Sequence, residues 1–401
     1  METYQESYHG KAVVLGKVSV AQCSDCHGYH DVRAVDDEAS MVALGKNRQE
    51  TCQQCHPGAT VGFSRFMPHA DPSRFDANPV LYVVQATITA LLLGVFLFFG
   101  LHTLLWGMRE LVDAFQNPRP PLHLYRGPAY VRFGVLDRIG HVLIAVTFIG
   151  LALTGAPLRF SQASWAPAVL AGLGGVETAG SLHRIFGAIT LLYFCLHLIH
   201  GLLRLFPALR KGTFVKTMTG GESIAPRLED FEDMLAHFRW FFFRAERPRW
   251  DRFTYWEKFD YWAIFWSIVF IGTSGLILWF PTVVTAVLPG EVINFAQIVH
   301  SGEALLAMAF IFGIHFFHAT MRRTRYPKDE TIFTGRAPAD AYREERPREW
   351  ERVEAQGRLA EKLDRPPSPA LRGLSRAFIV VGWILGGAVL LMIVHGYLTA
   401  A

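Results

Sequence analysis

The stretch LHRIFGAITLLYFCLHLIHG, residues 182–201, decides the fold class because it is apolar over the length of a membrane helix. From Ile185 to Leu203 the chain has no Asp, Glu, Lys or Arg. About 20 consecutive apolar residues are enough to cross the hydrocarbon core of a bilayer as an α-helix. The stretch therefore predicts a transmembrane helix.

The same pattern recurs along the 401-residue chain. Hydrophobic residues make up 51% of the sequence and charged residues 18%, and the mean hydropathy of +0.22 is too high for an ordinary soluble protein. Six segments have a suitable length and lack fixed charge, apart from Glu303 in the fifth: residues 80–106, 139–158, 185–203, 261–283, 292–320 and 377–400. We expect an all-α integral membrane bundle with six transmembrane helices.

Basic residues alternate between the loops that join these segments. Residues 107–136, 204–257 and 321–374 contain four, ten and thirteen Lys plus Arg, whereas 159–182 and 284–299 contain one and none. The positive-inside rule places the first three loops in the cytoplasm. Both termini then face the periplasm, as in a multi-pass protein of the bacterial inner membrane. The net charge of +4 is explained by these loops and requires no nucleic-acid partner.

Residues 1–79 are polar and carry the motif C-x-x-C-H twice, at residues 23–27 and 52–56. This spacing is typical of covalent haem c attachment, in which both thiols bond to the porphyrin and the adjacent histidine binds the iron. A zinc site is the alternative, although it needs four thiolates or imidazoles and no fixed histidine. The attachment residues are Cys23, Cys26, Cys52 and Cys55, and the expected iron ligands are His27 and His56. We expect a small irregular periplasmic module with two c haems.

Each c haem needs a sixth iron ligand if it only transfers electrons. The candidates are His9, His30 and His69, which are three histidines for two irons. The surplus predicts that one of them serves a haem of an upstream segment or of a partner cytochrome. The N-terminus has no basic or apolar region of a signal peptide. We expect a fragment or processed form of a longer exported protein. The alternative is that residues 80–106 act as a reverse signal anchor that exports the N-terminal module.

Four further histidines lie at two levels of the predicted bundle. His183 and His300 open the third and fifth spans on the periplasmic side, and His141 starts the second span on the cytoplasmic side. His315 follows His300 by 15 residues, which is roughly 22 Å in an α-helix. Ionisable residues inside a membrane are costly and by default functional. Four imidazoles on neighbouring helices can hold two b-type haems within a helical bundle.

The chain resembles the di-haem cytochrome b subunits of formate dehydrogenase, thiosulfate reductase and hydrogenase type. The matching stretches lie within residues 130–330: DRIGHVLIAVTFIGLALTGAP from 137, LHRIFGAITLLYFCLHLIHG from 182, YWEKFDYWAIFWSIVFIGTSGLILW from 255 and VHSGEALLAMAFIFGIHFFH from 299. The resemblance implies a four-helix di-haem core in which His141 pairs with His315 and His183 with His300. The stretch from Arg325 to Arg352 also resembles the branch that is fused to multihaem c cytochromes.

This sequence has more histidines than the family pattern needs. His197 lies 14 residues after His183, on nearly the same helix face, and His318 follows His315 by three residues. Both are alternative b-haem ligands at the lower level. A third b haem between His102 and His200 is an alternative to structural or quinone-pocket roles for these two residues.

An ionisable cluster at residues 255–261 precedes the fourth span. The resemblance implies a quinone pocket beside the lower haem, and quinone reduction consumes two protons. Glu257, Lys258 and Asp260 are therefore the candidates for quinone-site chemistry, with menaquinone the expected quinone. The alternative is that they are ordinary interfacial anchors among aromatic neighbours.

These observations predict five segments. Residues 1–79 form the di-haem c module, 80–128 the first transmembrane helix with its linker, 129–330 the di-haem b core, 331–374 a charged cytoplasmic connector, and 375–401 the last transmembrane helix. We expect electron transfer between the quinone pool and periplasmic or outer-membrane multihaem cytochromes, as a quinol:cytochrome c-type oxidoreductase. The alternatives are a non-catalytic anchor and wiring subunit of a larger dehydrogenase or reductase, and a zinc-bearing transporter.

Overall fold

The computed structural model describes residues 2–116, 125–323, 325 and 328–399. Within these ranges six helices are long and apolar enough to cross a membrane, which confirms the six predicted spans. They are α5 (Pro79–Gln116), α6 (Val135–Arg159), α8 (Val176–Arg210), α11 (Tyr255–Trp279), α13 (Glu291–Ala309) with its extension to Met321, and α18 (Pro369–Thr399). Part of the predicted linker, residues 117–124, and residues 324, 326, 327, 400 and 401 of the predicted segments lie outside the described residues.

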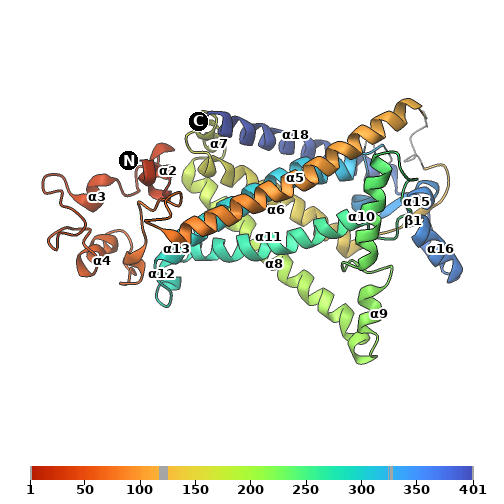
Figure 1. Cartoon of the computed structure of the whole chain (residues 1–401), viewed down its shortest axis with the longest axis horizontal. Coiled ribbons are helices and arrows are strands. Elements are labelled where there is room, and N and C mark those ends of the chain that lie inside the picture. Colours follow the sequence, from red (N-terminus) through yellow and green to blue (C-terminus); the bar gives the residue numbers. More distant parts are fainter. Residues whose placement is uncertain (1, 117–124, 324, 326–327, 400–401) are drawn as a thin grey trace.

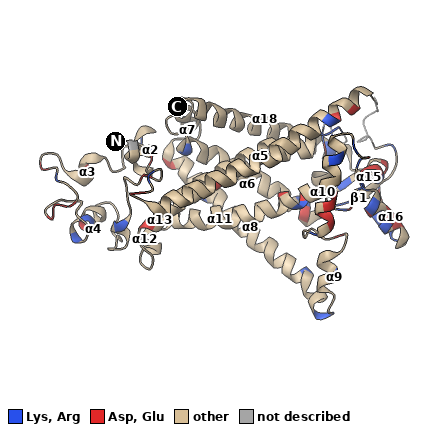
Figure 2. Cartoon of the chain, in the orientation of Figure 1, with Lys and Arg blue, Asp and Glu red and all other residues tan. Residues whose placement is uncertain are grey.

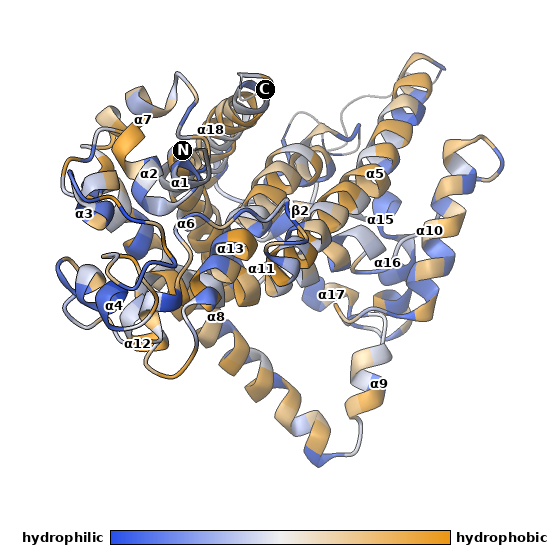
Figure 3. Cartoon of the chain, turned by 60° about the vertical axis from the view of Figure 1, so that its left-hand side comes forward, coloured by the Kyte–Doolittle hydropathy of each residue, from blue (hydrophilic) through white to orange (hydrophobic). Residues whose placement is uncertain are grey.

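The apolar faces of these helices point mostly outward. In the most apolar window of each helix, between 6% and 39% of the residues are buried inside the protein. A water-soluble bundle must instead turn its apolar stripe toward its own core. Figure 3 shows hydrophobic residues along the whole length of the long helices. The chain is therefore a multi-pass membrane protein in which lipid covers much of the bundle.

The bundle lies between two smaller parts of the molecule (Figure 1). The N-terminal module, residues 2–78, lies at one end together with the last turns of α18, and we call this the module end. The opposite end, which we call the loop end, contains α10 (Leu228–Phe241), α15 (Ala339–Glu345) and α16 (Pro347–Ala355). Lysine and arginine gather at the loop end (Figure 2). The charge asymmetry read from the sequence therefore coincides with the two ends of the fold.

The N-terminal module consists of short helices joined by irregular chain. Its helices are α1 (Glu2–Gln5), α2 (Tyr8–Val14), α3 (Cys23–His27), α4 (Lys46–Gln53) and the 3₁₀ turn η1 (Phe63–Arg65). The Ser7 hydroxyl caps α2 by accepting a hydrogen bond from the Gly10 amide, 3.2 Å away. Few of its apolar residues are buried. The sequence supplies too small an apolar core to hold such a module together without additional links.

Direct contacts attach the module to the bundle. Arg65 pairs with Glu291 at 2.7 Å, at the start of α13. The Asn294 side chain makes two hydrogen bonds with the Met67 backbone, at 2.8 and 3.1 Å. A Cβ atom on Gly62 would collide with the Thr285 carbonyl, so glycine permits this close approach. The short α12 (Pro281–Val284) lies in the same connection. The module is therefore held in one position relative to α13.

The membrane helices pack as two neighbouring pairs. Helix α6 packs on α8 with the short α7 (Ala166–Gly172) beside both, and α11 packs on α13. Helix α5 packs on α13, and α18 on α6. Beyond Ala309, α13 continues as the π-helical turns η2 (Phe310–His315) and η3 (Phe317–Met321). The expectation of a uniform α-helix from His300 to His315 is therefore wrong, because π turns change the rotation per residue.

The loop end contains a small sheet that the all-α expectation did not include. Strand β1 (Ala129–Val131) pairs antiparallel with β2 (Arg336–Pro338) on one side and with β3 (Leu363–Asp364) on the other. The predicted connector thus folds back onto the chain before α6, and its helical middle forms α15, α16 and α17 (Leu359–Lys362). The short helices α9 (Phe214–Thr219) and α14 (Thr331–Thr334) complete this end.

Candidate functional site

A single cavity of about 2470 Å³ runs through the molecule. Its lining begins in the N-terminal module, passes between α6, α8, α11 and α13, and ends at His318 and Arg322 at the loop end. Ordinary small-molecule pockets measure about 300–1,000 Å³. The cavity is therefore large enough for several large ligands placed one after another.

Both C-x-x-C-H motifs border this cavity. The first lies on α3, where Cys23 and Cys26 are three positions apart and therefore share one helix face. The second continues the last turn of α4, because the amides of Cys55 and His56 both bond to the Cys52 carbonyl, at 3.3 and 2.9 Å. All four thiols are free. Each motif thus presents two thiols and an imidazole to the same space.

The module brings each motif histidine close to one more histidine, with the two rings tilted relative to each other. The ring centroids of His56 and His9 are 6.3 Å apart, and those of His27 and His69 are also 6.3 Å apart. A metal bound by two imidazoles at about 2 Å each places their ring centroids roughly 6 Å apart. His30 is exposed and does not line the cavity. Of the three sixth-ligand candidates, the structure places His9 beside His56 and His69 beside His27, whereas His30 lies apart from the cavity.

Burial favours the neutral form of these imidazoles. Burial lowers the pKa of His9, with a smaller contribution from His56, and burial also lowers the pKa of His56. The pKa of His69 is lowered by burial first and then by His27. A neutral imidazole has a nitrogen free to bind a metal. These histidines are therefore in the protonation state that coordination requires.

The upper bundle level holds a third pair, His183 on α8 and His300 on α13. Their ring centroids are 6.1 Å apart and both rings line the cavity. His183 Nδ1 lies 2.9 Å from the Thr154 hydroxyl, and His300 Nδ1 lies 3.0 Å from the Ile271 carbonyl. These hydrogen bonds orient each ring and leave its Nε2 available. The pair has the spacing and the outer contacts of two axial metal ligands.

Glycines allow the partner helices to approach this pair. A Cβ atom on Gly155 of α6 would lie 3.1 Å from Cε1 of His183, and a Cβ atom on Gly275 of α11 would lie 3.1 Å from Cε1 of His300. Each glycine follows a hydroxyl residue, Thr154 or Ser274. The repeated hydroxyl-glycine dipeptide on α6 and α11 is therefore a sequence signal for the upper histidine pair, in addition to the histidines themselves.

The lower level contains His141 on α6 and His315 on the π turn η2. Both line the cavity and lie within electrostatic range of each other. His315 Nδ1 is 3.0 Å from the Asp260 carboxylate. Histidines that bind metals commonly donate their second nitrogen to a carboxylate, which fixes the tautomer. His141 packs edge-on against Phe333, with ring centroids 5.3 Å apart. The contacts of His315 are therefore those of an oriented ligand.

The surplus histidines have different surroundings. His197 Nε2 lies 2.8 Å from the Tyr261 hydroxyl, and His197 does not line the cavity. His318 does line it, is 3% exposed, and has no hydrogen-bond partner at either ring nitrogen. His102 contacts His237 and His318, and no ring contact with His200 occurs among the described residues. Of these histidines only His318 borders the space between the lower pair and the loop end.

The three quinone-site candidates are all engaged by other side chains. Lys258 bonds to both oxygens of Asp230 at 2.8 Å and does not line the cavity. Glu257 accepts hydrogen bonds from Arg132 and Arg346, both at 2.9 Å, and caps α11. Asp260 binds His315 through one oxygen, while its other oxygen is buried without a partner. Asp260 and Glu257 line the cavity.

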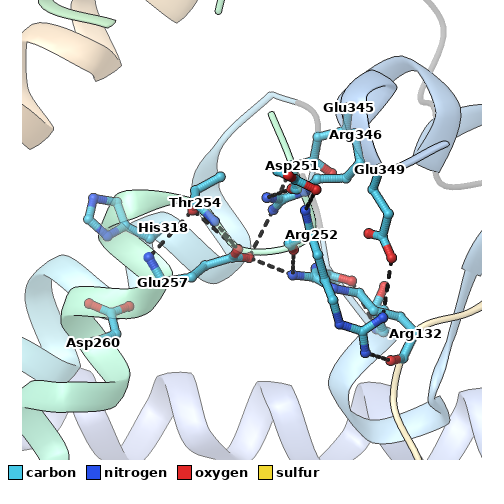
Figure 4. Close-up of polar contacts among 12 residues, drawn as sticks. Arg132, Asp251, Arg252, Thr254, Glu257, Asp260, His318, Glu345, Arg346 and Glu349 are labelled. Atoms are coloured by element: carbon cyan, nitrogen blue, oxygen red, sulfur yellow. Dashed lines mark hydrogen bonds and ion pairs between the residues drawn. The ribbon is translucent and has the colours of Figure 1, made fainter. Parts of the chain in front are cut away.

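Glu257 belongs to a buried ion-pair network that joins the start of α11 to the connector (Figure 4). Arg346 is fully buried and lies between Glu257 and Glu345. Although burial opposes it, the guanidinium groups of Arg325 and Arg346 lower the pKa of Glu345. A charge removed from such a network leaves its partner buried and unpaired, at a cost of several kcal/mol. The network therefore fixes the loop end to α11.

No protein-family model and no curated protein sequence matches this chain. Among the described residues, no three His, Cys, Asp or Glu side chains converge as a metal centre. The recurring unit is instead a pair of facing imidazoles, repeated from the module end to the loop end.

Proposed function

We propose that this chain is a membrane electron-transfer protein that holds two c haems in its module and two b haems in its bundle. The observation that carries the proposal is the series of histidine pairs along one continuous cavity. Three pairs have ring centroids 6.1–6.3 Å apart, and two of these include the histidine of a C-x-x-C-H motif. Haem iron supplies reversible one-electron chemistry when it is bound between such ligands.

The side chains around the cavity would hold and orient the cofactors. The four module thiols would attach the c haems, with His27 and His69 as the ligands of one iron and His56 and His9 as the ligands of the other. In the bundle His183 and His300 would hold the upper haem, and His141 and His315 would hold the lower one. Thr154, Ile271 and Asp260 fix the imidazole orientations. The contacts of Arg65 with Glu291 and of Met67 with Asn294 keep the two sets at a fixed separation.

The proposed physiological reaction is quinol oxidation at the loop end with electron delivery at the module end. The basic loops place the loop end in the cytoplasm of a bacterial inner membrane. Electrons that leave to the periplasm then move with the usual membrane potential, which is negative inside and contributes about 2.3 kcal/mol per electron for each 100 mV. The potential therefore assists electron delivery to the acceptor, a periplasmic or outer-membrane multihaem cytochrome.

One observation favours a second candidate function. Glu257 and Lys258, two of the three ionisable quinone-site candidates, are occupied by ion pairs. This supports a non-catalytic anchor and wiring subunit that carries electrons for a dehydrogenase or reductase partner. Purified protein that is reduced by a quinol without any partner subunit distinguishes the first function from the second.

The haem content of the purified chain tests the proposal. We expect a pyridine haemochrome spectrum with equal amounts of haem c and haem b, from cells that attach haem c. The variant H183A is expected to lose one of the two b haems, because its pair supplies the axial ligands of the upper iron. The matched control H197A removes a histidine from the same helix and should retain both. A colourless protein, or a metal-loaded protein without porphyrin, contradicts the proposal.

A further inference from the structure

Three titratable side chains meet in a dry aromatic cluster at the loop end. His102 of α5, Tyr255 of α11 and His237 of α10 are 0%, 8% and 0% exposed. The Tyr255 hydroxyl lies between His102 Nε2 and His237 Nδ1, at 2.8 Å from the latter. The surrounding buried rings are Trp106, Trp240, Phe241, Trp250 and Trp256. None of these three central residues has a role in the histidine pairs.

The hydrogen-bonding groups of this triad can transfer a proton from one end to the other. A neutral imidazole has one N–H donor and one acceptor nitrogen, and a phenol donates one hydrogen bond while it accepts another. A hydroxyl between two ring nitrogens therefore donates to one and accepts from the other. Moving one proton along each of the two hydrogen bonds shifts a charge from one imidazole to the other without moving heavy atoms.

Both ends of the triad are open. His102 Nδ1 and His237 Nε2 are buried and have no hydrogen-bond partner. An unpaired buried polar group costs about 1–3 kcal/mol. A purely structural cluster avoids this cost when an apolar side chain of similar shape occupies the position. The two unpaired nitrogens are the points at which a proton can enter and leave.

One end of the triad adjoins the cavity, and a partly exposed carboxylate lies near its central tyrosine. The rings of His102 and His318 are 5.8 Å apart, and His318 lines the cavity with both nitrogens unpartnered. Asp233 precedes His237 by one turn of α10 and lies within electrostatic range of Tyr255. The Asp233 side chain is 17% exposed and pairs with Arg348.

The charged groups around the triad come from several elements. Arg322 stacks on Trp106 and Trp256, and Arg247 lies near Glu110 and His237. Burial raises the pKa of Asp233, whereas its bond to Arg348 acts in the opposite direction. Burial and then the neighbouring His102 and Arg247 lower the pKa of His237. These surroundings favour a neutral triad that passes a proton on.

We propose that His102, Tyr255 and His237 form a proton relay between the loop end of the cavity and the aqueous surface at Asp233. The proposal rests on the proposed function, because a quinol at that end of the cavity supplies the protons. Oxidation of one quinol releases two electrons and two protons. Bound haem would accept the two electrons, and the relay takes up each proton.

The proton transfers are balanced at each atom. A proton binds His102 Nδ1, and the proton on His102 Nε2 passes to the Tyr255 oxygen. The Tyr255 O–H proton passes to His237 Nδ1, and His237 releases the proton on its Nε2. Asp233, one turn before His237 on α10, is the proposed final acceptor. The two imidazole rings and the Tyr255 O–H must then turn to restore the starting tautomers before the second proton passes.

The variant Y255F tests the relay in the complete, haem-loaded chain, because it removes only the bridging hydroxyl. Pre-reduced menadiol is the electron donor, and dithionite reduction serves as the proton-independent reference. We expect unchanged haem content and dithionite reduction, and a menadiol-driven rate lowered by about 100-fold, the lower end of the range that positioned acid–base groups supply. The control Y130F removes a buried hydroxyl that donates to Glu349 at 3.1 Å, away from the cavity, and should react as wild type.

The variant D233N provides a second test at the surface end, where substitution perturbs the core less. We expect a slower menadiol reaction that millimolar amounts of a small weak acid restore, because the acid replaces the Asp233 carboxyl. A merely structural role for Asp233 does not predict this rescue. Wild-type menadiol rates in both Y255F and D233N overturn the relay. A haem-loaded wild type that menadiol cannot reduce overturns the proposed quinol reaction instead.

Discussion

Substitution of Gly155 by alanine is expected to displace His183, which we propose as a ligand of the upper haem. The new Cβ atom would lie 3.1 Å from Cε1 of His183, which is closer than ordinary van der Waals contact. The ring must therefore move by a few tenths of an ångström. This movement lengthens the 2.9 Å contact between His183 Nδ1 and the Thr154 hydroxyl. Loss of such a hydrogen bond costs about 1 kcal/mol, which is roughly fivefold in haem affinity.

The assay is the transfer of haem b from the purified protein to an excess of apomyoglobin, followed by absorbance. In G155A we expect one b haem to leave about five times more readily, while both c haems stay attached. The G275A variant should behave alike, because its Cβ atom would lie 3.1 Å from Cε1 of His300. The control G201A adds a methyl group on α8 where no atom lies within 4 Å.

Helix propensity predicts that G155A affects thermal stability and haem retention differently. Alanine is favoured over glycine in a helix by about 1 kcal/mol, so G201A and G155A should both resist thermal unfolding at least as well as wild type. Haem retention in G155A equal to that of G201A would refute the assignment of His183 as a ligand positioned by α6.

Three further predictions concern the module, the lower level and the loop end. H69A is expected to convert one c haem from six-coordinate low-spin to high-spin in the electron paramagnetic resonance spectrum, whereas H30A should leave the spectrum unchanged. D260N removes the carboxylate that orients His315 and should weaken binding of the lower b haem by about 10–100-fold, as measured by the same haem transfer. The pKa of Glu345 is lowered on folding, so its stabilising contribution is present above its unfolded pKa and is lost as the pH falls through its lower folded value. In E345Q the free energy of unfolding should therefore fall less as the pH is lowered. The same acid dependence of the unfolding free energy in E345Q and wild type would contradict this.

Only part of the candidate site could be predicted from the sequence. The motifs at residues 23–27 and 52–56 and the histidines at two membrane levels follow from local spacing, and they all border the cavity. The choice between His30 and His69 depends on how the irregular module folds back on itself. The contact of Asp260 with His315 could not be predicted either, because the two residues are 55 positions apart in the sequence and lie on different helices.

The sequence by itself determined the six membrane spans, the alternating charge of their loops and the two C-x-x-C-H motifs, since apolar length, loop charge and residue spacing are local properties. The tertiary structure alone decided which imidazoles face each other, that π turns carry His315 and His318, and that the connector forms a small sheet with β1. It also enclosed Tyr255 between His102 and His237. These features depend on contacts between distant segments and on a change in helical rotation, neither of which residue spacing encodes.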